Sequence, residues 1–307
     1  MSGVFLLVGL CLGAIGAMLM VPSARSTAPL VADAASGTAT MSVEAKTGES
    51  LPSEGPAPSP QPSPPPSEPG KSDPGKPVAV ELKAITELVP GGQVSVVVYD
   101  RTAKKNLISL QPDRSYTSAS LVKILIALDA LQAGTSTASV QRMLSMSDDN
   151  LASALWSTHG GASIVTRWAT KIGLTGTRPP EDPGRWGDTR ITAADIGRIY
   201  RYVMDQVGPG TRSIIMRALS GATESGADGI RQYFGIPDAT GAIPWSVKQG
   251  WSCCRGARIL HTSGVVGKDD RYIVVVLTSQ PTSTTYASGG RQVTAAVRAL
   301  LPALTGA

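Results

Sequence analysis

Ser120 and Lys123 are three residues apart at the start of the apolar stretch SLVKILIALDAL, and they form the only Ser-x-x-Lys in the chain. Residues three apart in a helix project from the same face, so the hydroxyl and the amine can meet. A serine becomes a nucleophile when a neighbouring base takes its proton, and burial or a nearby cation lowers the pKa of a lysine toward that role. The pair therefore suggests covalent acyl transfer. The simpler interpretation is a lysine whose stem packs while its ammonium reaches water.

Two further polar clusters could complete such a site. The segment LSMSDDNLASALW places Ser147 and Asp149 at the expected start of a helix, where Ser and Asp also serve as ordinary N-caps. The segment WSVKQGWS places Lys248 in an expected strand, where a lysine can equally protect a sheet edge. If Lys248 lies near Lys123, its charge lowers the pKa of Lys123 further.

Hydrophobic periodicity predicts the elements that must position these residues. Residues 78–116 and 241–307 are expected to build one antiparallel five-stranded sheet with terminal helices on one face, and residues 117–240 an inserted all-helical lobe, an α/β (α+β) fold. The expected helices cover 77–89, the Ser120 segment, 138–145, 148–157, 161–172, 192–206, 211–221 and 288–304, and the expected strands cover 93–101, 105–112, 243–252, 257–267 and 271–280.

The first 77 residues indicate that the protein is exported. Residues 1–35 contain the apolar run VFLLVGLCLGAIGAMLMV, which is long enough for a signal peptide or a single membrane anchor, and both remain open. Cys11 follows Leu10, whereas a lipid-modified cysteine should follow a small residue, so lipidation is not favoured. Residues 36–77 form a Pro-rich linker expected to be disordered. We therefore expect an extracytoplasmic domain over 78–307, secreted or anchored, that contacts the membrane only through its N-terminal segment.

In this order, Ser-x-x-Lys, Ser-Asp-Asp and Lys-Gln-Gly resemble the Ser-x-x-Lys, Ser-Asp-Asn and Lys-Thr-Gly motifs of class A β-lactamases and penicillin-binding proteins. The resemblance covers residues 78–305. Within that superfamily, SDD…LW and KQGW.CC look like an exported, uncharacterised β-lactamase-like group. The resemblance implies a serine enzyme that acts on β-lactams or D-Ala-D-Ala-like cell-wall peptides, without cofactor or metal, and we expect a monomer.

The resemblance also implies roles for individual residues. Ser120 would attack the carbonyl, Lys123 would hold or relay its proton, and Ser147 would pass that proton to the leaving nitrogen. Lys248 would bind the substrate carboxylate. The backbone N–H groups of Ser120 and Trp251 would form the oxyanion hole.

The chain departs from the family pattern at several of these positions. Asp149 stands where the family usually has Asn, and Gln249 where it has Thr or Ser. With Gly250 and Trp251 they are expected to bind substrate, and the longer Gln249 side chain could fill the cleft. The segment GLTGTRPPEDPGRWGDTRITAADI resembles the omega loop and the following helix, yet no Glu has the usual spacing for the deacylating base. Glu181 and Asp182 are the candidates, and deacylation is expected to be slow.

Composition narrows the alternatives. The net charge of +5 is spread without a basic stripe, which argues against nucleic-acid binding. The two histidines, His159 and His261, lack zinc-ligand spacing. Adjacent Cys253 and Cys254 could form a vicinal disulfide or remain two packed thiols. The rival function is a non-catalytic module that keeps the cleft and binds cell-wall material; a secreted structural domain would leave the Ser-x-x-Lys unexplained.

Overall fold

The computed structural model describes residues 82–305. The expected leader over 1–35 and the expected linker over 36–77 lie outside the described residues. Among the residues described, no helix is both long and apolar enough to cross a membrane.

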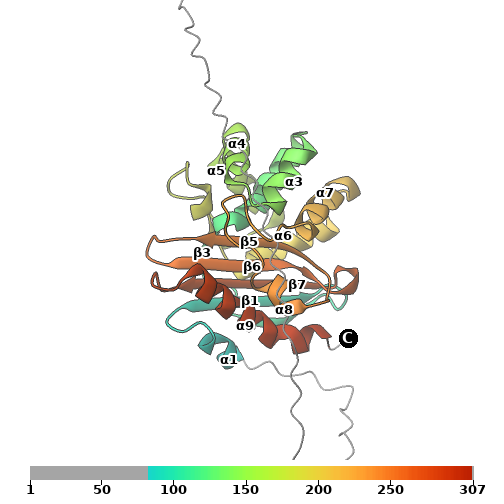
Figure 1. The fold of residues 1–307 in the computed structure, drawn as a ribbon. Helices are drawn as coiled ribbons and strands as arrows, with labels where there is room; N and C mark the ends of the chain where they lie inside the picture. Colours follow the sequence, from blue (N-terminus) through green and yellow to red (C-terminus); the bar gives the residue numbers. More distant parts are fainter. Residues whose placement is uncertain (1–81, 306–307) are drawn as a thin grey trace, which may run out of the picture. The chain divides into compact units, whose positions relative to one another are not determined.

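A five-stranded sheet forms the centre of the domain (Figure 1). Its order is β2-β1-β7-β6-β5, and every neighbouring pair is antiparallel. Its first two strands and its last three therefore come from opposite ends of the described chain, which confirms the expected assembly. The strands are β1 (Gln93–Asp100), β2 (Lys105–Leu110), β5 (Trp245–Ser252), β6 (Arg258–Val266) and β7 (Tyr272–Gln280).

Alternation along the strands supplies two hydrophobic cores, one on each face of the sheet. In β7, Ile273, Val275 and Leu277 pack into the core of the helical lobe, whereas Val274 and Val276 pack into the core under the terminal helices. Successive strand residues point to opposite faces, so a central strand covered on both sides is apolar throughout. The terminal helices are α1 (Leu82–Glu87) and α9 (Tyr286–Thr305), which lie on the same side of the sheet in Figure 1.

The helical lobe lies on the other side of the sheet (Figure 1). Helix α6 begins at an N-cap in which Thr192 Oγ1 accepts the N–H of Asp195. Its buried residues, among them Ile196 and Tyr200, belong to the core of the lobe. The lobe helices are α2 (Lys123–Gln132), α3 (Thr137–Ser145), α4 (Asp149–Thr158), α5 (Ala162–Ile172), α6 (Ala193–Asp205) and α7 (Pro209–Ser220).

Two short features are not among the elements that the sequence predicts, and one of them, a ribbon, departs from an all-helical lobe. A two-stranded ribbon joins β3 (Tyr116–Thr117) to β4 (Arg190–Ile191), and a five-residue helix, α8 (Ile236–Thr240), precedes β5. Both are too short to carry a hydrophobic period, which is why periodicity misses them. The ribbon ties the chain before Ser120 to the segment that returns after α5.

Candidate active site

The Ser120 turn lies against the edge strand β5. Ser120 belongs to a 3₁₀ turn, η1 (Ala119–Val122), that runs directly into α2. Gly250 of β5 makes the close approach possible, because a Cβ built there would lie 3.0 Å from the Ser118 carbonyl oxygen and 3.3 Å from Leu121. Ala119 has a φ of 46°, a left-handed conformation that non-glycine residues adopt rarely. The turn is thus held by packing in a conformation that costs backbone energy, as is common at functional sites.

Four side chains form a continuous hydrogen-bonded chain in this region. Lys123 Nζ lies 2.9 Å from Ser120 Oγ and 3.1 Å from Ser147 Oγ. Lys248 Nζ donates to the same Ser147 Oγ at 2.9 Å. Ser147 occupies the turn before α4 with a φ of 53°, and Lys123 Nζ also donates to its carbonyl oxygen at 2.7 Å. The structure therefore brings together two hydroxyls and two amines, from η1, α2, the α3–α4 turn and β5.

Both lysines are buried, and burial dominates their protonation. Burial lowers the pKa of Lys123, while the carboxylates of Asp149, Asp228 and Asp148 act in the opposite direction. Burial also lowers the pKa of Lys248 well below its ordinary value, and the charge of Lys123 lowers it further. Proximity of two amines in a dry site favours a state in which one of them is neutral.

Asp149 is an ion-pair partner of Lys123. Its Oδ1 lies 2.5 Å from Lys123 Nζ, while 63% of its side chain remains exposed. Asp148, its neighbour, turns away to cap α4 by accepting the N–H groups of Asn150 and Leu151. The first Asp of the Ser-Asp-Asp segment is therefore structural, and the second pairs with Lys123.

Ser120 opens into a cleft of about 430 Å³. The residues that line it come from η1, α4, the 184–188 segment, the turn before α8, the end of β5 and the start of α9. Among them are Ser120, Asp149, Trp186, Asp188, Asp228, Trp251 and Tyr286.

The 184–188 segment covers Lys123 with an aromatic ring. The Trp186 ring centroid lies 4.8 Å from Lys123 Nζ, and its indole N–H donates to Ser153 Oγ at 3.1 Å. Asp188 in the same segment is already neutralised, because its Oδ2 accepts from Arg185 at 2.6 Å and from Arg255 at 3.0 Å.

Glu181 and Asp182, the candidate deacylating bases, do not line the cleft that contains Ser120. They line an adjoining cavity of about 470 Å³, together with Arg190 and Ile259. Asp182 Oδ1 accepts the N–H of Gly184 at 2.9 Å, which is a turn contact within its own loop. Trp186 of this loop lies against Lys123, whereas Glu181 and Asp182 of the same loop line the other cavity.

Gln249 is held on the side of β5 away from Ser147. Its side-chain amide donates to the carbonyls of Gln232 at 2.9 Å and Phe234 at 2.6 Å, and the residue is buried. Lys248, its neighbour, reaches Ser147. The expectation that the Gln249 side chain could fill the cleft is therefore wrong, because strand alternation directs adjacent side chains to opposite faces. Gln249 instead anchors the segment that leads into α8.

Trp251 lines the cleft and is fixed by Asp228. The Trp251 indole N–H donates to Asp228 Oδ2 at 2.8 Å, and the ring centroid lies 5.8 Å from Lys248 Nζ. From the sequence, Trp186 could either line a cleft or pack in the core, and the structure places it in the cleft. Sequence reasoning missed Asp228 and Asp188 as cleft residues, because they lie in a turn and in a three-residue 3₁₀ segment that carry no hydrophobic period.

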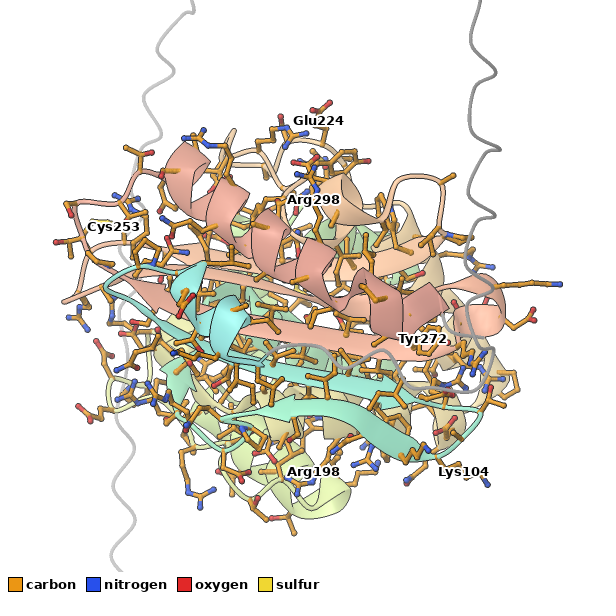
Figure 2. All side chains as sticks on the ribbon, turned by 90° about the horizontal axis from the view of Figure 1, so that it is seen from below. Lys104, Arg198, Glu224, Cys253, Tyr272 and Arg298 are labelled. Atoms are coloured by element: carbon orange, nitrogen blue, oxygen red, sulfur yellow. A yellow bond between two sulfur atoms is a disulfide. The ribbon has the colours of Figure 1, made fainter. Side chains whose placement is uncertain are left out.

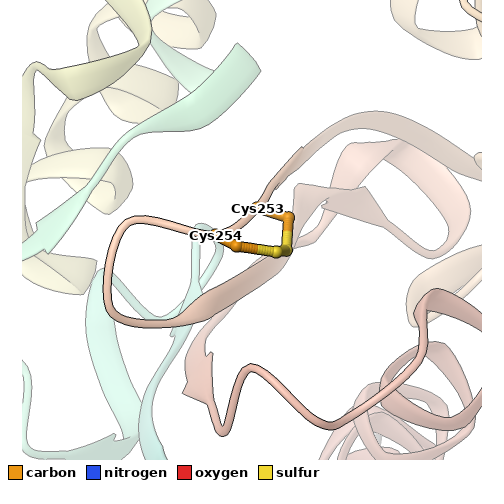
Figure 3. Close-up of a disulfide and its surroundings, with 2 residues drawn as sticks. All are labelled: Cys253 and Cys254. Carbon is orange, nitrogen blue, oxygen red and sulfur yellow. A yellow bond between two sulfur atoms is a disulfide. The ribbon is translucent and has the colours of Figure 1, made fainter.

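The loop after β5 contains a disulfide between Cys253 and Cys254 (Figure 3). Of the two alternatives open at the sequence level, the structure has the vicinal bridge. Cys253 lines both the cleft and the adjoining cavity. In Figure 2 it lies at the opposite end of the sheet from Tyr272, as the pairing of Tyr272 with Val266 requires. Within residues 82–305, no cluster of three or more His, Cys, Asp or Glu side chains could hold a metal ion.

Comparison with known proteins identifies a mycobacterial relative. The chain is 40% identical over 225 residues to the "Putative lipoprotein LppW" of Mycobacterium tuberculosis and of Mycobacterium bovis, an alignment that covers 69% of this chain and 70% of theirs. No family model matches the sequence.

Solved structures with the same fold are class A β-lactamases and a penicillin-binding protein. A class A β-lactamase from Mycobacterium abscessus has a TM-score of 0.60 at 18% identity, covering 73% of this chain and 97% of that one. A class A representative from Bacteroides cellulosilyticus has a TM-score of 0.62 at 12% identity, with 74% and 96% covered. PBP-A has a TM-score of 0.60 at 15% identity, with 73% and 95% covered. The domain therefore has the class A β-lactamase and penicillin-binding-protein fold.

Proposed function

Because this chain belongs to the family of the mycobacterial LppW proteins and has the class A β-lactamase fold, we propose that it is a serine acyl-transfer enzyme. Its nucleophile is Ser120, and its substrates are β-lactams or D-Ala-D-Ala-like cell-wall peptides. The observation that supports this most strongly is the hydrogen-bonded chain from Ser120 through Lys123 and Ser147 to Lys248, with Ser120 open to the cleft. One of the solved structures with this fold is an acyl-enzyme complex of a PBP-A mutant with penicillin G.

Acylation begins when Ser120 Oγ attacks the carbonyl carbon. Its proton passes to Lys123 Nζ along the 2.9 Å contact, which requires Lys123 to be neutral beforehand. Burial favours that neutral state, and the Asp149 carboxylate opposes it. The backbone N–H groups of Ser120 and Trp251 then stabilise the oxyanion, and each such donor is typically worth about 3 kcal/mol in the transition state.

Collapse of the tetrahedral intermediate requires a proton on the leaving atom. Ser147 Oγ is hydrogen-bonded to both lysines, so it can give its proton to the leaving nitrogen and take one from Lys123. The C–N bond breaks, the acyl group stays on Ser120, and Lys123 returns to its neutral form. In this relay Lys248 donates a hydrogen bond to Ser147 Oγ, and it would also bind the polar end of the substrate.

Deacylation needs a base that activates water, and we propose that this step is slow. Glu181 and Asp182 line the adjoining cavity, and the Asp188 carboxylate is occupied by Arg185 and Arg255. Asp149 is engaged by Lys123. The acyl-enzyme should then persist, as in a penicillin-binding protein.

The location we propose is outside the cytoplasm. The relatives are named as lipoproteins, and the apolar N-terminal run of this chain fits a membrane anchor or a removed leader. The Pro-rich linker would hold the domain away from the membrane.

The test is covalent labelling of the purified full-length protein by penicillin G, followed by intact mass over minutes to hours. A stable adduct of one penicillin on the wild type and none on Ser120→Ala is expected. Rapid loss of both adduct and penicillin would make it an efficient hydrolase and contradict the slow deacylation. The ion pair of Asp149 with Lys123 also fits a non-catalytic wall-binding module. Reversible binding of wall fragments that Ser120→Ala leaves intact, without any adduct, would favour that function.

A further inference from the structure

The acyl-transfer relay does not use the cavity that adjoins the catalytic cleft. The volume of this cavity is about 470 Å³, which is within the usual range of ligand pockets. Arg185, Asp188, Ser252 and Cys253 line both the cavity and the cleft, so the two spaces meet at the end of β5. A molecule held at Ser120 can therefore extend into the cavity.

The order of groups along β5 indicates which part of a substrate would extend there. Lys248, which we expect to bind the substrate carboxylate, comes three residues before Trp251, whose backbone N–H we expect to hold the oxyanion. Ser252 and Cys253 follow, and both line the cavity. Each strand residue advances the chain by about 3.3 Å. An extended substrate with its carboxylate at Lys248 thus directs its opposite end, the acyl side chain, past Cys253.

The charged residues of the cavity include both signs in equal number. Three arginines and three carboxylates line it, so their formal charges sum to zero. They are Arg185, Arg190, Arg255, Glu181, Asp182 and Asp188. Arg185 and Arg255 bind the same Asp188 carboxylate. The Asp182 carboxylate also acts electrostatically on Arg185.

Arg190 and Glu181 are the two charges that remain without an ion-pair partner. The ion pairs of residues 82–305 include neither side chain. Pro179, Ala257 and Ile259 add apolar surface to the same cavity. The cavity thus offers a guanidinium for a carboxylate, a carboxylate for an amine, and apolar surface for the methylene groups that connect them.

The backbone holds Arg190 in a fixed place near the nucleophile. Arg190 pairs with Thr117 in the ribbon of β3 and β4, and Thr117 precedes Ser120 by three residues. The N–H and the carbonyl of Arg190 also bond to the backbone of Arg178, at 2.9 and 3.0 Å. A binding group on a hydrogen-bonded strand is positioned more precisely than one on a loop.

We propose that this cavity binds the acyl side chain of the substrate and selects side chains that end in both a carboxylate and an amine. Arg190 binds the carboxylate, which its planar guanidinium fits, and Glu181 binds the amine. This inference rests on the proposed function and specifies its substrate class. The substrate keeps the carboxylate that Lys248 binds and carries a zwitterion at its other end. A side chain with only one of these charges leaves either Arg190 or Glu181 unpaired.

The experiment uses four penicillins that share the ring system and its carboxylate and differ only in the acyl side chain. The side chains are zwitterionic aminoadipyl, linked through its δ-carboxyl, adipyl with a carboxylate only, aminopentanoyl with an amine only, and uncharged pentanoyl. In each case Ser120 Oγ bonds to the β-lactam carbonyl carbon, and its proton passes to Lys123. The ring C–N bond breaks, the nitrogen takes a proton through Ser147, and the protein gains the mass of one whole penicillin.

The measured quantity is the second-order rate constant of acylation of the full-length protein, from the loss of β-lactam absorbance. This rate constant reports acylation whether deacylation is fast or slow. For the wild type we expect the zwitterionic penicillin to exceed the uncharged one by about tenfold, the scale of two exposed ion pairs of up to about fivefold each. The two singly charged penicillins should fall between them.

Arg190→Gln and Glu181→Gln separate the two contacts. The preference for a carboxylate is the rate ratio of aminoadipyl to aminopentanoyl penicillin, and Arg190→Gln should reduce this ratio to about one. The preference for an amine is the rate ratio of aminoadipyl to adipyl penicillin, and Glu181→Gln should reduce that ratio to about one. Lys105→Gln is the matched control, because Lys105 begins β2 at the opposite edge of the sheet from β5. It should keep both ratios.

Three results would overturn the inference. The first is four equal rate constants in the wild type, which needs no variant. The second is a pair of ratios that Arg190→Gln and Glu181→Gln both leave as they were. The third is an equal fall for all four penicillins in either variant, which would mean that the residue supports the cleft and binds no side chain. Failure of the proposed function is distinguishable from these, because none of the four penicillins would then form an adduct on Ser120.

Discussion

Lys123 experiences two opposing influences, and Asp149 controls their balance. Burial lowers its pKa toward the neutral base that acylation needs, and the Asp149 carboxylate raises it again. A family member with Asn at this position has no such opposing charge. The Asp149 side chain is the departure that we expect to slow the enzyme most at neutral pH.

Asp149→Asn should therefore move the pH dependence of acylation to lower pH. Removing the anion removes the main influence that raises the pKa of Lys123, so the rising limb of the profile begins earlier. The measurement is the acylation rate with phenyl acetate, an ester that does not titrate, from pH 5 to 10. As a control, Asp269→Asn in the turn between β6 and β7 should keep the wild-type midpoint. A midpoint that rises in Asp149→Asn would contradict the role given to this ion pair.

We also expect the buried Lys123 to lower the free energy of unfolding of the domain. A fully buried ammonium is desolvated, and replacement of a buried ion by an apolar side chain of similar volume is often neutral or stabilising. We expect Lys123→Met to abolish acylation yet to unfold in denaturant within about 1 kcal/mol of the wild type or at higher stability. The ion-pair partner Asp149 is largely exposed, so Lys123→Met would not leave a buried carboxylate without a partner. A loss of several kcal/mol would show that the lysine is structural.

For individual residues, the spacing along the sequence predicted part of the site. Three-residue spacing and apolar neighbours indicated Ser120 and Lys123, and the resemblance of Lys-Gln-Gly to the family's Lys-Thr-Gly motif indicated Lys248. Strand alternation places Gln249 on the opposite face of β5 from Lys248, so its distance from the cleft follows from the strand itself. Asp228 lies in a turn whose backbone path depends on long-range packing, so one sequence carries no signal for the direction of its side chain.

Among the elements, the contact between η1 and β5 positions the nucleophile. Gly250→Ala would place a methyl group 3.0 Å from the Ser118 carbonyl and push η1 away from the strand. We expect acylation to fall by about 10²-fold, because small displacements of a reacting group have large effects. Gly210→Ala is the control, since a Cβ at Gly210 in α7 meets nothing within 4 Å. Equal acylation rates in the two variants would mean that Gly250 does not position Ser120.

The regular elements were largely predictable, because each carries a hydrophobic period. The expected strands over 93–101, 243–252, 257–267 and 271–280 differ from β1, β5, β6 and β7 by two residues or fewer at each end. The ribbon of β3 and β4 and the short helix α8 have two to five residues and no period. The cleft walls also come largely from short or irregular segments, such as residues 184–188 and the turn that holds Asp228, so they were the least predictable part of the site.

For the whole molecule, a sheet with a core on each face places its central strands in a dry environment. His261 in β6 is fully buried, and its Nε2 lies 2.9 Å from the Thr117 carbonyl oxygen. Its Nδ1 accepts the backbone N–H of Thr278 at 3.1 Å. Both ring nitrogens are thus satisfied within the core. Burial lowers the pKa of His261 to about 4.

His261 should make the fold sensitive to acid. Its pKa falls from the ordinary value of 6.5 to about 4 on folding. The neutral form is therefore favoured in the folded state, and the stability it supports is complete above pH 6.5 and lost as pH falls toward 4. A shift of this size corresponds to about 3 kcal/mol. Urea unfolding at pH 7 and pH 4 should show a larger loss in the wild type than in His261→Gln. Equal losses would assign the acid sensitivity to other groups.

The central claim is that Ser120 becomes acylated. The most direct measurement is to expose the full-length protein to phenyl acetate, quench, and map the acetyl group by peptide mass spectrometry, with Ser120→Ala and Lys123→Met in parallel. We predict one acetyl group on Ser120 in the wild type and no acetylated peptide from the same region in either variant. An acetyl group elsewhere at equal yield, or none on Ser120 under conditions where the ester remains intact, would contradict the account.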